Sequence, residues 1–192
     1  MNNQDTINKF EKIIINAFNS VPQDYYKLKT ACSSEGIVRE RVFCYELYHR
    51  IRCLQKIEQL PDFNIHGEID KRGYALFDKD DWRNPDFVFH KPGSMDENLI
   101  VIEVKGNLDH GGVIKDWQTL YKFCDTYHYG VGLWLVYNYT YTEIVKELSK
   151  IEQRFEEKTA DQIKLICKKS ADSKLDIISF SELFSDVLVK MK

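Results

Sequence analysis

The chain has 192 residues, of which 43% are hydrophobic and 13% aromatic, and its 27 basic and 30 acidic residues give a formal net charge of −3. This composition is typical of one globular domain with a sizeable core, and it excludes an intrinsically disordered chain. The charge balance also excludes strong binding of polyanions through an overall excess of basic residues, so such binding has to be local or guided by a partner protein.

Targeting and cysteine signals are weak. No apolar run approaches the ~20 residues needed to cross a bilayer, and the first residues lack the basic and apolar regions of a secretory signal. We therefore expect a cytoplasmic protein without membrane contact. The five cysteines are odd in number and contain no Cys-x-x-Cys pair, which indicates neither a zinc site nor a disulfide framework. We expect most of them to be buried.

Two amphipathic helices are predicted in the first third of the chain. Residues 7–18 carry apolar side chains at helical spacing, typical of a helix that closes the core, with a partner-binding arm as the alternative. A longer helix is predicted to begin at residues 33–35, with Ser34 as its cap, and to run to about Gln59. Its apolar stripe consists of Phe43, Leu47, Ile51 and Leu54.

Strands and helices then alternate. Residues 62–70, 84–90 and 99–106 read as strands, and Glu68 is placed near the end of the first. A loop containing Gly111 and Gly112 precedes a helix over residues 113–127. Residues 130–138 form a near-continuous apolar run, which predicts a strand buried on both faces. Because a helix separates it from the strand before, we expect those two strands to be parallel.

The remaining elements are predicted to flank this region. A helix runs from Thr142 through Phe155, and residues 163–167 and 175–179 read as edge strands. A final helix begins at Ser181 and carries an apolar stripe. We expect that stripe to pack on the core, with a seam between two copies of the chain as the alternative.

The residues that carry chemistry lie on the two strands in the middle of the chain. Asp86 follows Pro85 at the start of one strand, and Glu103 and Lys105 lie near the end of the next. Residues i and i+2 of a strand share a face, so Glu103 and Lys105 are about 7 Å apart on one side. If the strands pair, their spacing of about 4.8 Å lets Asp86 lie beside Glu103.

Two carboxylates and an ammonium group around one point suit a divalent cation. Paired carboxylates repel each other unless a cation lies between them, and Mg²⁺ or Mn²⁺ prefers such oxygen ligands. A metal-bound water is more acidic, and Lys105 could orient or deprotonate it for in-line attack on a phosphodiester. The alternative is structural: Asp86 starts a strand, and Glu103 and Lys105 form a modest ion pair on a solvated face.

Pro85-Asp86 followed by Glu103-Val104-Lys105 resembles the signature of the PD-(D/E)XK nuclease superfamily, and Glu103 follows Asp86 by 17 positions, enough for a hairpin. The resemblance implies an α/β fold with a restriction-endonuclease-like core over about residues 33–138. In that core a central mixed β-sheet is flanked by helices. Residues 1–22 and 142–192 would be flanking additions to this single domain. The resemblance also implies that Asp86, Glu103 and the backbone carbonyl of Val104 bind Mg²⁺ or Mn²⁺, and that Lys105 assists the attacking water.

Further site residues are implied by the same resemblance. The first core helix often contributes a glutamate, and Glu40 and Glu46 are the candidates. They are six residues apart, about 240° around a helix, so they cannot both face one point. Glu40 is slightly favoured because it lies on the apolar stripe. Lys115 and Gln118 on the later helix are candidates for substrate binding, although an exposed polar face explains them equally well.

We therefore expect a metal-dependent nuclease that hydrolyses nucleic-acid phosphodiester bonds, with DNA preferred, in restriction, phage defence or repair. It could work as a homodimer or with a targeting partner. The alternative is a protein that keeps the nuclease fold without cleaving and binds nucleic acid or protein. The negative net charge and the absence of an obvious basic face in the sequence favour this alternative, and the presence of all three signature residues opposes it.

Overall fold

The computed structural model describes residues 3–31, 33–58, 63–67, 84–91, 97–151 and 161–191. The helices are α1 (Asn3–Asn19), α2 (Gln23–Tyr26), α3 (Glu40–Ile57), α4 (His110–Asp125), α5 (Tyr141–Leu148) and α6 (Phe180–Lys190). The strands are β1 (Leu28–Thr30), β2 (Ser33–Ile37), β3 (Asn64–Gly67), β4 (Phe87–His90), β5 (Asn98–Lys105), β6 (Val131–Tyr137), β7 (Ile163–Lys168) and β8 (Asp176–Ser179).

A mixed sheet forms the centre of the fold. Within the described residues its strands follow the order β3-β4-β5-β6-β7-β8. Strand β5 is antiparallel to β4 and parallel to β6, and β7 is parallel to β6 and antiparallel to β8. Every residue of β6 is buried, so the predicted strand with two buried faces is confirmed, as is its parallel pairing with β5. The predicted α/β class with a mixed sheet flanked by helices is also confirmed.

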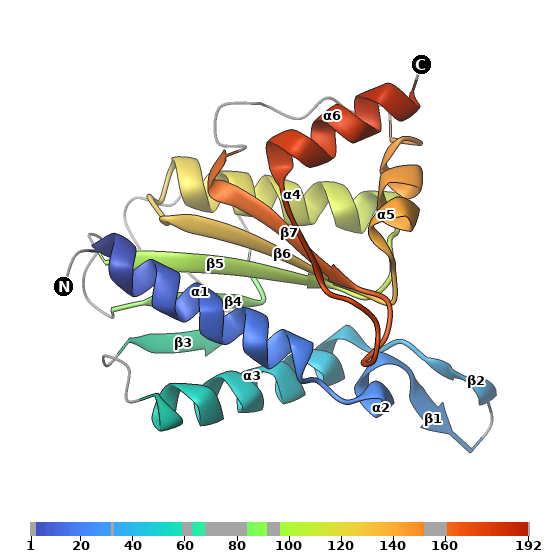
Figure 1. The fold of residues 1–192 in the computed structure, drawn as a ribbon, viewed down its shortest axis with the longest axis horizontal. Helices are drawn as coiled ribbons and strands as arrows, with labels where there is room; N and C mark the ends of the chain where they lie inside the picture. Colours follow the sequence, from blue (N-terminus) through green and yellow to red (C-terminus); the bar gives the residue numbers. More distant parts are fainter. Residues whose placement is uncertain are drawn as a thin grey trace.

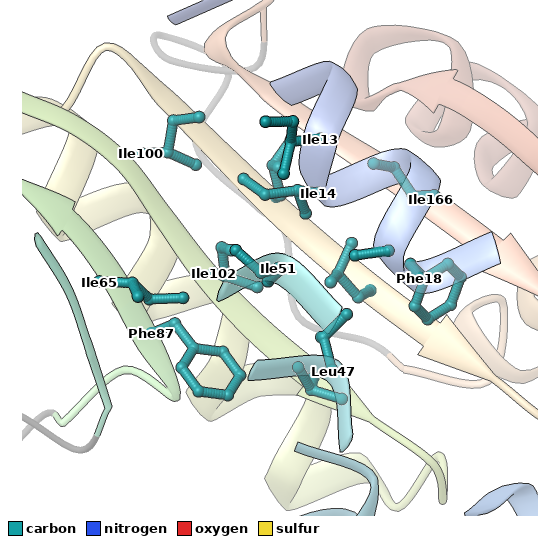
Figure 2. Close-up of a cluster of buried hydrophobic side chains, with 14 of the residues drawn as sticks. Ile13, Ile14, Phe18, Leu47, Ile51, Ile65, Phe87, Ile100, Ile102 and Ile166 are labelled. Carbon is teal, nitrogen blue, oxygen red and sulfur yellow. The ribbon is translucent and has the colours of Figure 1, made fainter. Parts of the chain in front are cut away.

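Helices cover both faces of the sheet (Figure 1). Helices α1 and α3 pack on one face, and α4, α5 and α6 pack on the other. Figure 2 shows the first of these interfaces, where isoleucines of α1 lie beside Ile51 of α3 and Ile102 of β5. Because strand side chains alternate between faces, Val101, Glu103 and Lys105 project to the opposite side of β5, toward α4. The polar residues of β5 therefore lie on the side of the sheet that α4 covers.

The second helix begins later than the sequence predicts. Residues 33–37 form β2, which pairs with β1 in an antiparallel hairpin, and α3 starts only at Glu40. Ser34 is therefore not a helix cap. Gly36 has a φ of +73°, a conformation that few other residues adopt readily. The next residue, Ile37, pairs with Leu28 of β1. The helix itself ends at Ile57, close to its predicted end.

Other boundaries also differ from the sequence-based prediction. Gly111 and Gly112 lie in the first turn of α4 rather than in a loop, because the Asp109 side chain caps that helix. Helix α5 ends at Leu148, and residues 152–160 lie outside the described ranges. Strand β7 is an interior strand and not an edge, since β8 pairs with its far side. Within the predicted strand over 62–70, residues 64–67 form β3, and Glu68 lies outside the described residues.

The general expectations for the chain hold in part. Cys44, Cys124 and Cys167 are buried, whereas Cys53 is exposed; Cys32 lies outside the described residues. The apolar stripe of α6 packs on the core through Phe180, Leu183 and Val187. None of the helices in the described ranges is long and apolar enough to span a bilayer.

Candidate active site

Asp86 and Glu103 lie side by side, as the sequence predicts. Phe87 of β4 is paired with Ile102 of β5, and the same antiparallel register continued by one residue places Asp86 opposite Glu103. Oδ2 of Asp86 accepts a hydrogen bond of 2.7 Å from the backbone N–H of Val104. This bond holds the Asp86 carboxylate, directly before the start of β4, next to Glu103 on the neighbouring strand β5.

Glu103 is a buried acid whose hydrogen-bonding capacity is not fully used. Its side chain is 5% exposed, and Oε1 has no hydrogen-bond partner among the described residues. Burial raises its pKa well above the usual value, and the nearby carboxylates of Asp86 and Asp116 raise it further. Burial likewise raises the pKa of Asp86. A cation placed beside this pair would relieve both the repulsion and the lost solvation.

Lys105 is held between two acids, one on α4 and one at the start of α3. Its Nζ lies 3.3 Å from Oδ2 of Asp116 and 3.8 Å from Oε2 of Glu40. Burial acts to lower the pKa of Lys105, but Asp116 and Glu40 outweigh that effect, so the pKa is raised. Lys105 therefore keeps its proton at neutral pH and is a hydrogen-bond donor rather than a base.

The sequence analysis missed Asp116, the acid closest to Lys105 in this site. It lies on α4, where its side chain is 4% exposed, and its Oδ2 also accepts a 3.3 Å hydrogen bond from Nε1 of Trp134. Burial raises the pKa of Asp116 to about 7. The available signal was its position three residues after Val113 and four before Leu120, which places an acid on the buried stripe of the helix.

The structure brings Glu40, and not Glu46, to the site. Glu40 is the first residue of α3, and its Oε1 accepts a 3.0 Å hydrogen bond from the backbone N–H of Gly106. Glu46 instead pairs with Arg50, one turn along the same helix, at 2.7 Å. The helix geometry that allows only one of the two acids to face the site thus selects the one that the sequence slightly favours.

The first turn of α4 approaches Lys105 closely. The Asp109 side chain accepts a 2.7 Å hydrogen bond from the N–H of Gly112. A Cβ atom added to Gly112 would lie 3.0 Å from Nζ of Lys105, so this position has little room for a side chain. Beyond this turn, Lys115 is exposed, yet it lies near enough to lower the pKa of Glu103. Gln118 is also exposed, and no hydrogen bond joins it to the described site residues.

A pair of histidines lies on the same face of the sheet. Nδ1 of His66 on β3 is 2.8 Å from Nε2 of His90 on β4. His66 is paired with Val88, which lies midway between Asp86 and His90 on β4, so the alternation of strand side chains places all three polar residues on one face. The sequence does not reveal this pair, because it depends on the register between strands that are 24 residues apart.

The donor set suits a hard, strongly hydrated cation. No group of three or more His, Cys, Asp or Glu side chains able to hold a metal ion occurs among the described residues. Mg²⁺, however, commonly uses one or two carboxylates and keeps several waters. Asp86 and Glu103 supply two carboxylates, and the Val104 carbonyl is the candidate third ligand. The unpartnered Oε1 of Glu103 is the structural observation that fits such an ion.

Comparison of the chain with family models, with curated proteins and with solved structures finds no match. The resemblance to the PD-(D/E)XK superfamily therefore depends on the signature residues Asp86, Glu103 and Lys105 alone.

Proposed function

We propose that the chain is a metal-dependent nuclease with a restriction-endonuclease-like core of the PD-(D/E)XK type. The observation that carries this proposal is that Asp86, Glu103 and Lys105 share one face of β4 and β5, and that a buried Glu103 oxygen has no hydrogen-bond partner among the described residues. A buried and a half-buried carboxylate with raised pKa values in one place cost free energy to fold, which a purely structural role does not explain.

The order of elements around the site supports the same proposal. A helix that supplies Glu40 precedes the antiparallel strands β3, β4 and β5, and helix α4 and the parallel strand β6 follow. This is the arrangement that the resemblance implies for the core. Lys105, at the end of β5, contacts Glu40 at the start of α3 and Asp116 of α4.

The residues divide the chemistry among themselves. Asp86, Glu103 and the Val104 carbonyl would hold Mg²⁺ or Mn²⁺, which when bound lowers the pKa of a coordinated water and offsets phosphate charge. Lys105, protonated between Asp116 and Glu40, donates a hydrogen bond to the attacking water or to a phosphate oxygen. Asp116 and Glu40 position that ammonium group. The water oxygen would then form a bond to phosphorus as one ester P–O bond breaks, and the proton that the water loses would be balanced by protonation of the leaving oxygen, which leaves a phosphomonoester and an alcohol.

DNA is the proposed substrate, and restriction, phage defence or repair are the roles that the resemblance favours. The experiment is a cleavage assay on supercoiled plasmid, linear duplex, single-stranded DNA and RNA, with Mg²⁺, Mn²⁺ or chelator. Wild type is compared with Lys105→Ala, and with Lys146→Ala as a control at an exposed lysine of α5. Metal-dependent cleavage by wild type and Lys146→Ala, but not by Lys105→Ala, supports the proposal. Cleavage that survives Lys105→Ala contradicts it.

The rival is a nuclease-like fold that binds without cleaving. A calorimetric titration with Mn²⁺ separates the two, because a catalytic site must bind the ion through Asp86 and Glu103. We expect binding by the wild type that is lost in Asp86→Ala. If Mn²⁺ does not bind, or binds equally well to Asp86→Ala, the catalytic proposal fails and the binding role remains.

A further inference from the structure

Helix α3 exposes a basic and aromatic face on a chain whose net charge is negative. Three basic residues of this helix are exposed, namely Arg41, Arg52 and Lys56. Both glutamates of α3 are partly buried. Its two glutamates are engaged elsewhere, one at the site and one with Arg50. A basic face therefore exists, although none is obvious in the sequence, where its members are interspersed with buried and paired residues.

The exposed residues form one continuous row, which we name the α3 stripe: Arg41, Tyr45, Tyr48, Arg52 and Lys56. Their spacings of four, three, four and four residues keep them on one side of a helix. At 1.5 Å per residue the row is about 22 Å long. The stripe therefore presents two neighbouring aromatic rings with cations on either side of them, along an extended path and not as a compact patch.

The aromatic members are unusually open to solvent. Tyr45 is 67% exposed and Tyr48 is 38% exposed, whereas tyrosine is ordinarily intermediate between buried and exposed. Among the described residues, no acidic side chain pairs with Arg52 or Lys56, and Nη1 of Arg52 donates only to Gln55 of the same helix, at 3.0 Å. The Tyr45 ring and the positive charges of Arg52 and Lys56 are therefore available to a partner.

The stripe is continuous with the candidate active site. Glu40, which contacts Lys105, immediately precedes the first member of the stripe. The ring of Tyr48 stacks on Phe87 with centroids 6.3 Å apart and an angle of 26° between the planes. Phe87 directly follows Asp86, but the two side chains lie on opposite faces of the sheet. The stripe therefore starts next to Glu40, at the edge of the site, and leads away from it along α3.

We propose that the α3 stripe binds a single-stranded segment of nucleic acid and directs it to the site at Asp86 and Glu103. Aromatic rings stack on the faces of unpaired bases, and the cations that flank them meet the phosphates, a combination typical of single-strand recognition. A duplex hides its base faces and would use the basic residues but not the tyrosines. That the bound nucleic acid reaches Asp86 and Glu103 rests on the proposed function. The binding of nucleic acid to the α3 stripe does not.

The test measures binding to the full chain without cleavage. Fluorescence anisotropy with labelled oligothymidine and with a labelled duplex, in the presence of chelator, compares wild type with Arg52→Glu/Lys56→Glu and with Tyr45→Ala. The control is Lys146→Glu/Lys190→Glu, which makes the same change of charge at exposed lysines of α5 and α6. Circular dichroism verifies that each variant folds.

We expect wild type to prefer the single strand. The double charge reversal should weaken binding by at least about tenfold and reduce the salt dependence. Tyr45→Ala should weaken single-strand binding by about tenfold and leave duplex binding unchanged, and the control should bind like wild type. Preference for the duplex, absence of binding by wild type, or equal loss in the control pair each overturns the inference.

The outcome is separable from that of the proposed function. If wild type binds Mn²⁺ and cleaves, while the stripe variants bind the single strand as tightly as wild type, the stripe is wrong and the nuclease stands. If the stripe variants lose binding, but wild type neither binds Mn²⁺ nor cleaves, the stripe stands and the nuclease is wrong.

Discussion

Oδ2 of Asp116 lies 3.3 Å from Nζ of Lys105 and also accepts a hydrogen bond from Trp134, which joins α4 to the sheet directly behind the candidate site. Lys105 and Asp116 are both almost fully buried. A buried ammonium group keeps its proton only where an acid compensates its lost solvation. Asp116 is the largest of the influences that raise the pKa of Lys105, and this makes it a positioning residue for the proposed reaction.

Replacing Asp116 by Asn tests this role, because the amide keeps the shape and the hydrogen bond to Trp134 but removes the charge. We expect metal-dependent cleavage at neutral pH to fall by about 10- to 100-fold. The pKa of Lys105 should fall, so the alkaline limb of the pH–rate profile should move to lower pH. Asp125→Asn, at an exposed acid of the same helix, is the matched control. An alkaline limb that does not move would contradict the assigned role.

The stability of the metal-free chain should decrease as pH rises. The folded-state pKa of Asp116 is about 7, and those of Asp86 and Glu103 are also raised. Between about pH 4 and pH 7 the folded state therefore binds more protons than the unfolded state, and deprotonation costs stability on the order of 2–4 kcal/mol. In chelator, the melting temperature should be higher at about pH 5 than at about pH 8.

Divalent metal should reverse this trend. Because the ion competes with protons for Asp86 and Glu103, we expect Mn²⁺ to raise the melting temperature more at about pH 8 than at about pH 5. Glu103→Gln should flatten the pH dependence in chelator and remove most of the effect of Mn²⁺. A melting temperature that rises with pH in chelator, or a Mn²⁺ effect that persists in Glu103→Gln, would count against the site.

Much of the site could be predicted from the sequence because it lies on one regular element. The apolar residues of β5 alternate with Glu103 and Lys105, so their shared face follows from the geometry of a strand. The β4–β5 register puts Asp86 opposite Glu103. Strand β6 was equally clear, since an uninterrupted apolar run suits a strand with both faces buried.

The features that the sequence does not show depend on contacts between distant segments. Ser34 reads locally as a helix cap, but the pairing of Ile37 with Leu28 makes the segment a strand. The position of β7 inside the sheet depends on β8, which pairs with its far side. Asp116 was not predicted as a site residue, although its helical spacing already placed it with Val113 and Leu120.

Gly112 and Gly111 offer a matched pair of substitutions in one helical turn. In Gly112→Ala the new Cβ would lie 2.6 Å from Oδ2 of Asp109 and 3.0 Å from Nζ of Lys105. We therefore expect loss of the helix cap, worth about 1 kcal/mol, and at least about tenfold slower cleavage from a displaced Lys105. In Gly111→Ala the nearest atom is 3.8 Å away, so stability should rise by roughly 0.4–1 kcal/mol.

Thermal unfolding and the cleavage rate, measured on both glycine variants, check this expectation. The two substitutions add the same methyl group to neighbouring residues, so helix propensity alone predicts equal gains in stability. Similar melting temperatures and similar cleavage rates for Gly111→Ala and Gly112→Ala would show that the close approach to Lys105 has no consequence.

The choice between the two glutamates of α3 gives the last test. Glu40→Gln retains a carbonyl oxygen for the Gly106 N–H but removes the charge 3.8 Å from Lys105. We expect cleavage to slow by about tenfold with little change in melting temperature. Glu46→Gln removes an ion pair within one helix, which should cost about 0.3–0.5 kcal/mol and leave cleavage unchanged.

The two cleavage rates, measured side by side at saturating Mg²⁺, decide the question. Equal rates in the two variants would remove Glu40 from the site, and a slower rate in Glu46→Gln would show that the wrong face of α3 has been assigned to it.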